Sequence, residues 1–160
     1  MPKEKLPMTQ AIRTLNDQKV RFTLHSYAYV DRGGTTVAAD ALHADEHQVI
    51  KTLVMEDHDG EPLVVLMHGD REVSTKALAR SLGVKTVSPC DPETANKHTG
   101  YVVGGISPFG TRKTLRVYVE KTILDLPRIY INAGKRGLLA EMSPQDLNRI
   151  LNPTPVEVAI

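Results

Sequence analysis

The sequence predicts a single α+β domain built from about seven strands and several short helices. Its 160 residues are enough to bury one sizeable core, and no internal repeat, low-complexity tract or Ser/Gly-rich linker divides them. The candidate strands are joined mostly by hairpin-like links, without the regular strand–helix alternation of a parallel sheet. We therefore place one domain over residues 1–160, which ends in a short loose tail, NPTPVEVAI.

The first part of the chain predicts two short helices and a strand. Thr9 can cap a helix that runs through about residue 18, because three apolar residues after it fall on one helical face. Arg21–Tyr27 alternates two sets of side chains, which is typical of a strand. After a pair of glycines, Thr36 can cap a short helix over Val37–Leu42.

The next segments predict a hairpin followed by a helix. Ile50–Glu56 and Pro62–Gly69 are rich in β-formers, and the turn Asp57–Gly60 between them is a strong hairpin signal. The helix Thr75–Leu82 follows a serine that can cap its start, and Gly83 supplies the residue that commonly ends a helix.

The second half of the chain alternates short strands and short helices. Lys85–Ser88 predicts a strand, and Asp91 followed by proline predicts a helix that ends before Gly100. The last helix begins at Ser143 and runs through Leu151. Further strands are expected at Tyr101–Val103, Leu115–Val119, Arg128–Asn132 and Leu138–Met142.

The composition is that of an ordinary globular protein, with 41% hydrophobic and 24% charged residues. No apolar run approaches the roughly 18 residues needed to cross a bilayer, and the charged N-terminus lacks the apolar segment of a signal peptide. A single cysteine, Cys90, excludes an internal disulfide and a cysteine-based metal cluster. We expect a cytoplasmic protein without membrane contact.

Positive charge is concentrated in one part of the chain. The net charge is only +1, yet residues 100–136 hold seven Lys/Arg against two Asp/Glu. This modest basic patch is compatible with an anionic partner, and a solvated surface would explain it equally well. Aromatic residues, at 4%, are too few to predict a base-stacking platform of the RNA-recognition type.

The glycine-rich stretch Gly100–Lys113, GYVVGGISPFGTRK, matches none of the usual catalytic or phosphate-binding motifs. A phosphate loop would need lysine at Thr111. A serine-hydrolase elbow would need a second glycine two residues after Ser107, where the chain has Phe109. Elsewhere, His43 and His47 have metal-ligand spacing without an obvious third ligand. We therefore expect neither a metal nor an organic cofactor.

Backbone chemistry remains possible at Gly104-Gly105. Because the two glycines have no Cβ atoms, they and the following Ile106 and Ser107 can expose successive N–H groups. Such donors can stabilise the oxyanion that develops when an ester carbonyl is attacked. A simple glycine turn between two strands is the alternative.

Lys51 is the other residue that stands out, because it inserts a cation into the apolar run Ile50–Met55. By alternation it lies on the side of Leu53. A lysine on an apolar strand face needs an anion, a hydrogen-bonding partner or an outlet to water. A functional lysine and an edge-strand lysine that reaches solvent are both consistent with this pattern.

Four motifs occur in an order and at spacings that resemble the YbaK/EbsC aminoacyl-tRNA deacylases. They are FTLHSY at Phe22–Tyr27, VIKTL at Val49–Leu53, TGYVVGGISP at Thr99–Pro108 and GKRGL at Gly134–Leu138. This family is similar to the editing domain inserted in bacterial prolyl-tRNA synthetases. The resemblance covers residues 8–151 and implies a mixed, barrel-like sheet flanked by short helices.

The resemblance also implies trans-editing, the hydrolysis of the ester that joins a wrong amino acid to the 3′-terminal adenosine of tRNA, with tRNA(Pro) as the first candidate. In members that act on cysteinyl-tRNA(Pro), the substrate's own thiol attacks the ester, so the protein mainly positions the substrate. The implied catalytic residues are Lys51, Gly104, Gly105 and Ile106. The implied substrate-binding residues are Tyr27, Thr52, Ser107, Asn132 and Gly134.

Two polar positions of the cysteine-editing pattern differ in this sequence, and Ala133 replaces the first glycine of that pattern. That pattern reads Ser-Gly-Gly-Lys-Arg-Gly-Leu-Asp, whereas this chain has Asn132 in place of the serine and Leu139 in place of the aspartate. Loss of the acid makes alanine a candidate substrate beside cysteine. The cations expected to face the tRNA backbone are Arg112, Lys113, Lys135 and Arg136.

Two other functions remain open on the sequence. A non-catalytic module of the same fold would bind tRNA or a synthetase without cleaving the ester. A small-ester or thioester hydrolase would use Ser107 as its nucleophile. In the favoured interpretation the partners are aminoacyl-tRNA and, as a candidate, prolyl-tRNA synthetase; the sequence does not determine the oligomeric state.

Overall fold

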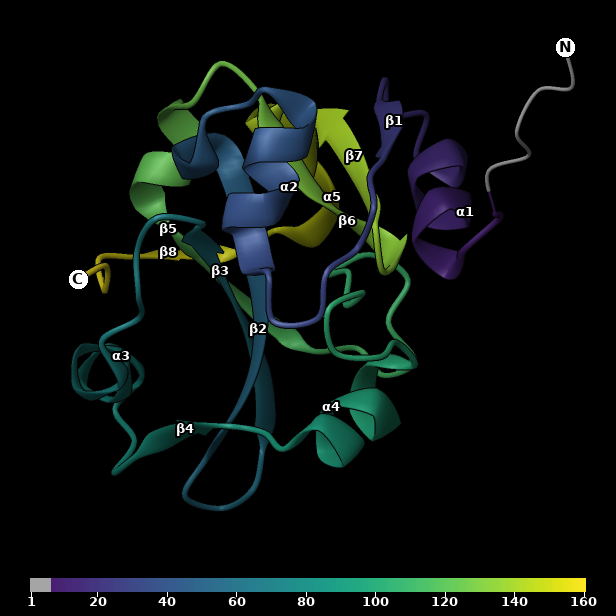
Figure 1. The fold of residues 1–160 in the computed structure, drawn as a ribbon. Coiled ribbons are helices and arrows are strands. Elements are labelled where there is room, and N and C mark those ends of the chain that lie inside the picture. Colours follow the sequence, from purple (N-terminus) through teal and green to yellow (C-terminus); the bar gives the residue numbers. More distant parts are fainter. Residues whose placement is uncertain (1–6) are drawn as a thin grey trace, which may run out of the picture.

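The computed structural model describes residues 7–160 and confirms the predicted α+β class (Figure 1). A mixed eight-stranded sheet contains β1 Thr23–Ser26, β2 Val49–Asp57, β3 Pro62–His68, β4 Val87–Pro89, β5 Arg116–Glu120, β6 Ile129–Lys135, β7 Leu138–Met142 and β8 Thr154–Val156. The helices around it are α1 Gln10–Asp17, α2 Gly34–Leu42, α3 Thr75–Leu82, α4 Pro92–Thr99 and α5 Pro144–Leu151, with short 3₁₀ turns η1 Glu46–Gln48 and η2 Lys121–Asp125.

The sheet is mixed and flanked by short helices, as expected, but it is not closed into a barrel. Its hydrogen-bonded order is β1-β7-β6-β2-β3-β5-β8, with β4 paired to β2 at one side. Closure would require the two edge strands to pair with each other. Within the described residues β1 pairs with β7 and β8 pairs with β5, but β1 and β8 do not pair with each other.

The central hairpin forms as predicted. Strands β2 and β3 pair antiparallel from Ile50 opposite His68 to Glu56 opposite Pro62. The Asp57 carboxylate closes the turn by accepting hydrogen bonds from the N–H groups of Asp59 and Glu61, at 2.9 and 3.1 Å. This hairpin is the centre of the sheet, and β2 also pairs in parallel with β6.

Most helix starts were also predicted correctly. The side chains of Thr9, Ser74, Asp91 and Ser143 each accept a hydrogen bond from the backbone N–H three residues on. Thr36 is an exception, because α2 begins two residues earlier and Thr36 lies inside it. Its hydroxyl instead bonds the Glu46 carboxylate, which lies in η1.

Two other predictions were wrong because long-range contacts decide them. Tyr101–Val103 forms no strand; the Tyr101 ring is buried, and its hydroxyl bonds the Phe109 carbonyl at 2.6 Å, which folds the glycine-rich stretch back on itself. The C-terminal residues are not a loose tail. They form β8 beside β5, and the buried Glu120 carboxylate accepts the N–H groups of Val158 and Ala159.

Helices cover both faces of the sheet. Helices α1 and α5 pack over one apolar cluster that includes Ile50, Val64 and Leu66 of the central hairpin. The alternate residues of β3 face a second cluster that contains α3, and α2 covers a third, smaller cluster with Val49 and Leu139. None of the helices in the described residues is both long and apolar enough to span a membrane.

Candidate functional site

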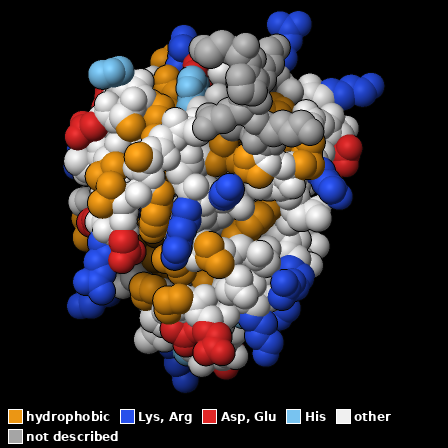
Figure 2. Space-filling model, turned by 45° about the vertical axis from the view of Figure 1, so that its right-hand side comes forward, with side chains coloured by type: hydrophobic (Ala, Val, Ile, Leu, Met, Phe, Trp, Pro, Cys, Tyr) orange, Lys and Arg blue, Asp and Glu red, His pale blue; other side chains and the backbone are white. Residues whose placement is uncertain are grey.

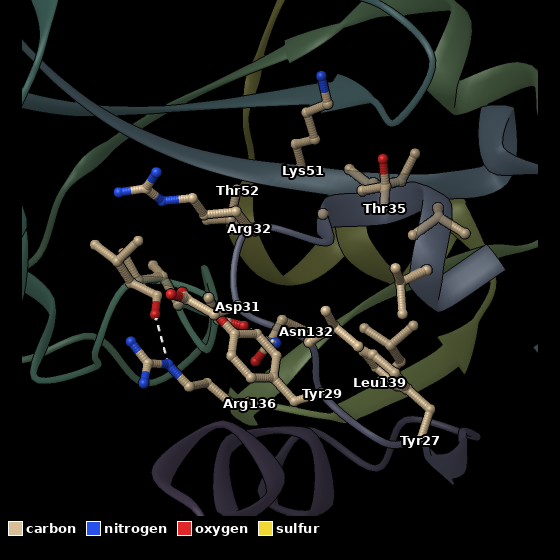
Figure 3. Close-up of a pocket in the computed structure, with 18 of the residues that line it drawn as sticks. Tyr27, Tyr29, Asp31, Arg32, Thr35, Lys51, Thr52, Asn132, Arg136 and Leu139 are labelled. Atoms are coloured by element: carbon tan, nitrogen blue, oxygen red, sulfur yellow. Dashed lines mark hydrogen bonds between the residues drawn. The ribbon is translucent and has the colours of Figure 1, made fainter. Parts of the chain in front are cut away.

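A cavity of about 390 Å³ opens beside α2, between the segment that follows β1, the start of β2 and the glycine-rich loop (Figure 3). Its lining is mainly apolar, with a few polar groups, as is common for small-ligand sites. Six residues that the sequence proposed for the site line it: Tyr27, Lys51, Thr52, Gly104, Ile106 and Asn132.

Lys51 lines the cavity through its side chain, which is 21% exposed. Its ammonium donates a hydrogen bond to the Arg71 carbonyl at 2.7 Å and lies 3.3 Å from the Glu72 carboxylate. Figure 3 shows the ammonium directed away from Tyr27 and Asn132. This cation is therefore held at the edge of the cavity by the loop after β3.

Thr52 is the neighbour of Lys51 and carries an unsatisfied hydroxyl. Among the described residues, its Oγ1 is the one buried side-chain N or O atom without a hydrogen-bond partner. An unpaired buried hydroxyl costs stability, and such groups in native proteins often have a functional reason. Thr52 also lines the cavity, so this hydroxyl is a candidate contact for a bound molecule.

The glycine-rich loop contributes Gly104 and Ile106 to the cavity. Neither of their backbone N–H groups has a hydrogen-bond partner within the described part of the chain. Gly105 differs, because its N–H donates to the Val102 carbonyl at 2.8 Å and closes a tight turn. Gly105 is buried and does not line the cavity, so the proposed role as an oxyanion donor does not fit it in this conformation.

Close packing explains why both positions are glycine. At Gly104, φ is +91° and a Cβ would lie 2.5 Å from the Tyr29 hydroxyl oxygen. At Gly105, a Cβ would lie 2.7 Å from the backbone nitrogen of Arg136. The glycines therefore bring the loop against Tyr29 and against the β6–β7 turn, which holds the cavity wall in place.

Asn132 joins these two segments. Its Nδ2 donates to the carbonyls of Gly104 and Lys135, and its Oδ1 accepts from the N–H groups of Gly134 and Lys135. Both amide hydrogens and both lone pairs of the oxygen are therefore used. Asn132 shapes the cavity but has no free polar group for a substrate.

Two expected substrate contacts lie outside the cavity. Ser107 is fully buried, and its Oγ accepts the N–H of Phe109 at 3.2 Å, so it stabilises a turn and does not line the cavity. Gly134, with φ +96°, packs against Tyr101 and Thr9. Both were proposed because they belong to motifs, and long-range packing places them away from the cavity lining.

The cavity mouth contains residues that the sequence reasoning missed: Tyr29, Asp31 and Arg32, on the segment between β1 and α2. Their only sequence signal was their position between the Phe22–Tyr27 motif and the following glycines. Arg136 also lines the mouth, as one of the four proposed tRNA contacts.

The other three proposed tRNA contacts are exposed but do not line the cavity. Arg112 packs beside Gly100, Lys113 lies 2.9 Å from the His98 ring, and Lys135 occupies the end of β6. On the face drawn in Figure 2, Lys and Arg side chains stand among exposed apolar side chains. Exposed Val30, Val102 and Val103 contribute to the apolar surface of the molecule.

The ionisable groups of the cavity are suited to binding. Burial, with a smaller effect of Tyr29, raises the pKa of Tyr27, so its hydroxyl stays protonated and can donate a hydrogen bond at neutral pH. No His, Cys or Ser side chain of the described residues lines the cavity. His43 and His47, whose spacing resembles that of metal ligands, do not share a helix, since α2 ends at Leu42 and His47 lies in η1.

The arrangement can therefore enclose an apolar group, offer hydrogen bonds from Thr52, Tyr27 and two backbone N–H groups, and place cations at the rim. It does not supply the nucleophile–histidine pair of a hydrolytic triad.

Comparisons with known proteins identify the family of this domain. The model of the aminoacyl-tRNA editing domain matches residues 33–150. The chain is 29% identical over 151 residues to EbsC of Enterococcus faecalis, assigned as a Cys-tRNA(Pro)/Cys-tRNA(Cys) deacylase, covering 94% of this chain and 92% of that protein. It is 33% identical over 97 residues to the proline–tRNA ligase of Streptococcus equi subsp. zooepidemicus, covering 60% of this chain but 15% of the ligase.

The fold has a close match among solved structures. A crystal structure assigned as a trans-editing enzyme for prolyl tRNA synthetase superposes with a TM-score of 0.83 and 20% identity, covering 97% of this chain and 99% of that one. At this identity the match supports the fold alone. The domain match spans most of the chain and includes most of the cavity lining. The chain belongs to the aminoacyl-tRNA editing domain family.

Proposed function

We propose that this protein is a trans-editing deacylase that removes a wrongly attached small amino acid, cysteine or alanine, from tRNA, with tRNA(Pro) as the preferred substrate. Translation would then be its cellular context and the cytoplasm its location. The family membership supports an aminoacyl ester as the bond that is cleaved, and the EbsC relative supports tRNA(Pro).

One observation carries the proposal: the unsatisfied Thr52 hydroxyl lies in the wall of a cavity that also contains Lys51 and the free N–H groups of Gly104 and Ile106. These groups are the donors that an ester and its developing oxyanion require. We infer that Gly104 and Ile106 stabilise the carbonyl oxygen and that Lys51 holds the nucleotide end of the substrate.

The nucleophile would come from outside the protein. With alanine as the substrate, water adds to the ester carbonyl carbon, the bond to the ribose oxygen breaks, and the amino acid leaves as a carboxylate. With cysteine, the substrate's thiol attacks the same carbon, closes a thiolactone ring and releases the ribose hydroxyl. Neither route needs a side-chain nucleophile, which agrees with the cavity lining.

The cavity favours a small apolar side chain. Leu139 replaces the acid of the cysteine-editing pattern, and it is 4% exposed in the wall of the cavity beside Val37 and Val49. Asn132, the other departure, has no polar group left for the substrate. An apolar wall can accept either alanine or cysteine, because pocket shape alone gives limited discrimination between small side chains, about 10–200-fold per methylene group.

The decisive assay follows loss of the aminoacyl ester from cysteinyl-, alanyl- and seryl-tRNA(Pro) incubated with the protein. We expect faster loss of the cysteinyl and alanyl esters than of the seryl ester. Absence of deacylation with all three would reject the enzymatic proposal for this tRNA. Salt-dependent binding of tRNA without ester loss would identify a non-catalytic module of the same fold. Repeating the assay with added prolyl-tRNA synthetase tests whether that enzyme is a partner.

Lys51→Ala tests the lysine directly, and Lys76→Ala on the exposed face of α3 is the matched control. We expect Lys51→Ala to abolish turnover with an unchanged circular dichroism spectrum, and Lys76→Ala to behave as wild type. Ser107→Ala tests the alternative hydrolase; loss of activity on free esters with full stability would favour it over the present proposal.

A further inference from the structure

Arg136 is held in an unusually well-defined position for an exposed arginine. Its Nε donates a hydrogen bond to the Val103 carbonyl at 2.9 Å, and its guanidinium carbon lies over the Tyr29 ring, 5.1 Å from the ring centre (Figure 3). Its two terminal amino groups have no hydrogen-bond partner within residues 7–160. The plane of the guanidinium is thus held in place, while its two terminal amino groups remain available to bind a ligand.

Tyr29 is fixed as well. Its hydroxyl end packs against Gly104, where a Cβ would lie 2.5 Å from the phenolic oxygen. On another side, a Cβ at Gly137 would lie 3.6 Å from the Cβ of Tyr29. Both glycines have positive φ, +91° and +78°, so the backbone there favours glycine for conformational reasons also. The ring and the guanidinium therefore form a preassembled pair at the cavity mouth.

The charge around this pair is unbalanced. The cavity lining contains three cations, Arg32, Lys51 and Arg136, against one carboxylate, Asp31. Lys51 is paired with Glu72, whereas neither arginine forms an ion pair with a carboxylate in the described part of the chain. A fixed, unpaired guanidinium fork is suited to bidentate binding of a phosphate.

We propose that Tyr29 and Arg136 bind the phosphodiester that adjoins the aminoacylated nucleotide, with Arg32 as a second, less constrained cation. The inference rests on the proposed function and extends it. The apolar cavity selects the amino acid, whereas this pair selects an ester that is attached to a nucleic acid strand. Free amino acid esters and aminoacyl-adenosine lack this phosphodiester and are poor substrates.

The test compares alanyl-tRNA(Pro) with 3′-alanyl-adenosine, which has the same ester without a phosphodiester. For Arg136→Ala we expect kcat/KM on the tRNA to fall about 10- to 100-fold, mainly through KM, since a charged hydrogen-bonded contact is lost. Activity on alanyl-adenosine should stay unchanged. Arg136→Lys should recover little, because lysine lacks the planar fork. Tyr29→Leu removes the ring beneath the guanidinium and should lower kcat/KM on the tRNA in the same direction as Arg136→Ala, by a smaller factor.

Arg80→Ala, which removes the same charge from exposed α3, is the control and should change neither substrate. An equal loss on both substrates, or no loss on the tRNA, would overturn the inference. If the wild-type protein cleaves no aminoacyl-tRNA, the proposed function fails, and binding of uncharged tRNA(Pro) still tests the pair. A plot of log affinity against log salt concentration has a negative slope, and Arg136→Ala should make that slope less steep by about 0.7, the value for one single-stranded phosphate contact. An unchanged slope would refute the proposed contact.

Discussion

Replacing Thr52 by valine should stabilise the protein and impair its activity at the same time. The change keeps the shape of the side chain and removes Oγ1, a buried atom without a hydrogen-bond partner. An unsatisfied buried hydroxyl costs about 1–3 kcal/mol, and valine is a good strand residue at this position in β2. Allowing for partial compensation, we expect a gain of about 1 kcal/mol, or about 2–4 °C in Tm for a chain of this length.

Thr99→Val is the matched control, because this threonine is also buried but its hydroxyl is satisfied. Thr99 Oγ1 donates to the Ala95 carbonyl at 2.8 Å and accepts the Tyr101 N–H at 3.1 Å. Two hydrogen bonds are lost and a backbone N–H is left unpaired, so we expect a loss of about 1–3 kcal/mol. The same chemical change should therefore have opposite signs at the two sites.

Urea denaturation followed by circular dichroism measures both stabilities, and the aminoacyl-tRNA assay measures the cost in activity. We expect Thr52→Val to lower kcat/KM about 10-fold or more, as one hydrogen bond to the bound substrate is lost. A destabilised Thr52→Val would show that the hydroxyl has a partner in solution. Full activity in a stabilised variant would remove Thr52 from substrate binding.

Three further changes test the site and the sheet. Gly104→Ala should lose more activity and stability than the control Gly60→Ala. Both glycines have positive φ, so both changes strain the backbone, but only the new Cβ at position 104 would meet Tyr29. Equal effects of the two changes in urea denaturation and deacylation assays would contradict this. Leu139→Ala enlarges the cavity, so it should cost about 2–4 kcal/mol and raise turnover of seryl- relative to alanyl-tRNA(Pro); an unchanged ratio would exclude Leu139 from specificity. Burial lowers the pKa of His68 below its unfolded value near 6.5, so the unfolded state binds more protons and stability should fall as pH drops from about 7 through the folded pKa. His68→Gln should flatten this pH dependence in urea titrations, and an unchanged slope would assign it to other groups.

The sequence alone determined the features that depend on neighbours three or four residues away. The four capped helix starts and the turn at Asp57 are closed by hydrogen bonds between residues close in the chain, so local residue types predict them. The family motifs also indicated much of the cavity lining, including Lys51 and Thr52. These motif residues come from separate elements that the fold then brings together.

Tertiary structure decided what depends on distant partners. The sheet is open because its end strands β1 and β8 do not pair with each other in the described part of the chain. The C-terminal residues become a strand only because β5 and Glu120 offer hydrogen-bonding partners. The same physical reason applies in the site. Ser107 is buried by packing, and the side-chain amide of Asn132 is fully used in hydrogen bonds to the glycine-rich loop and the end of β6. Arg136 is held in place by Tyr29 and by the Val103 carbonyl. A residue's type is fixed by the sequence, but whether its polar groups stay free for a substrate depends on contacts across the whole chain.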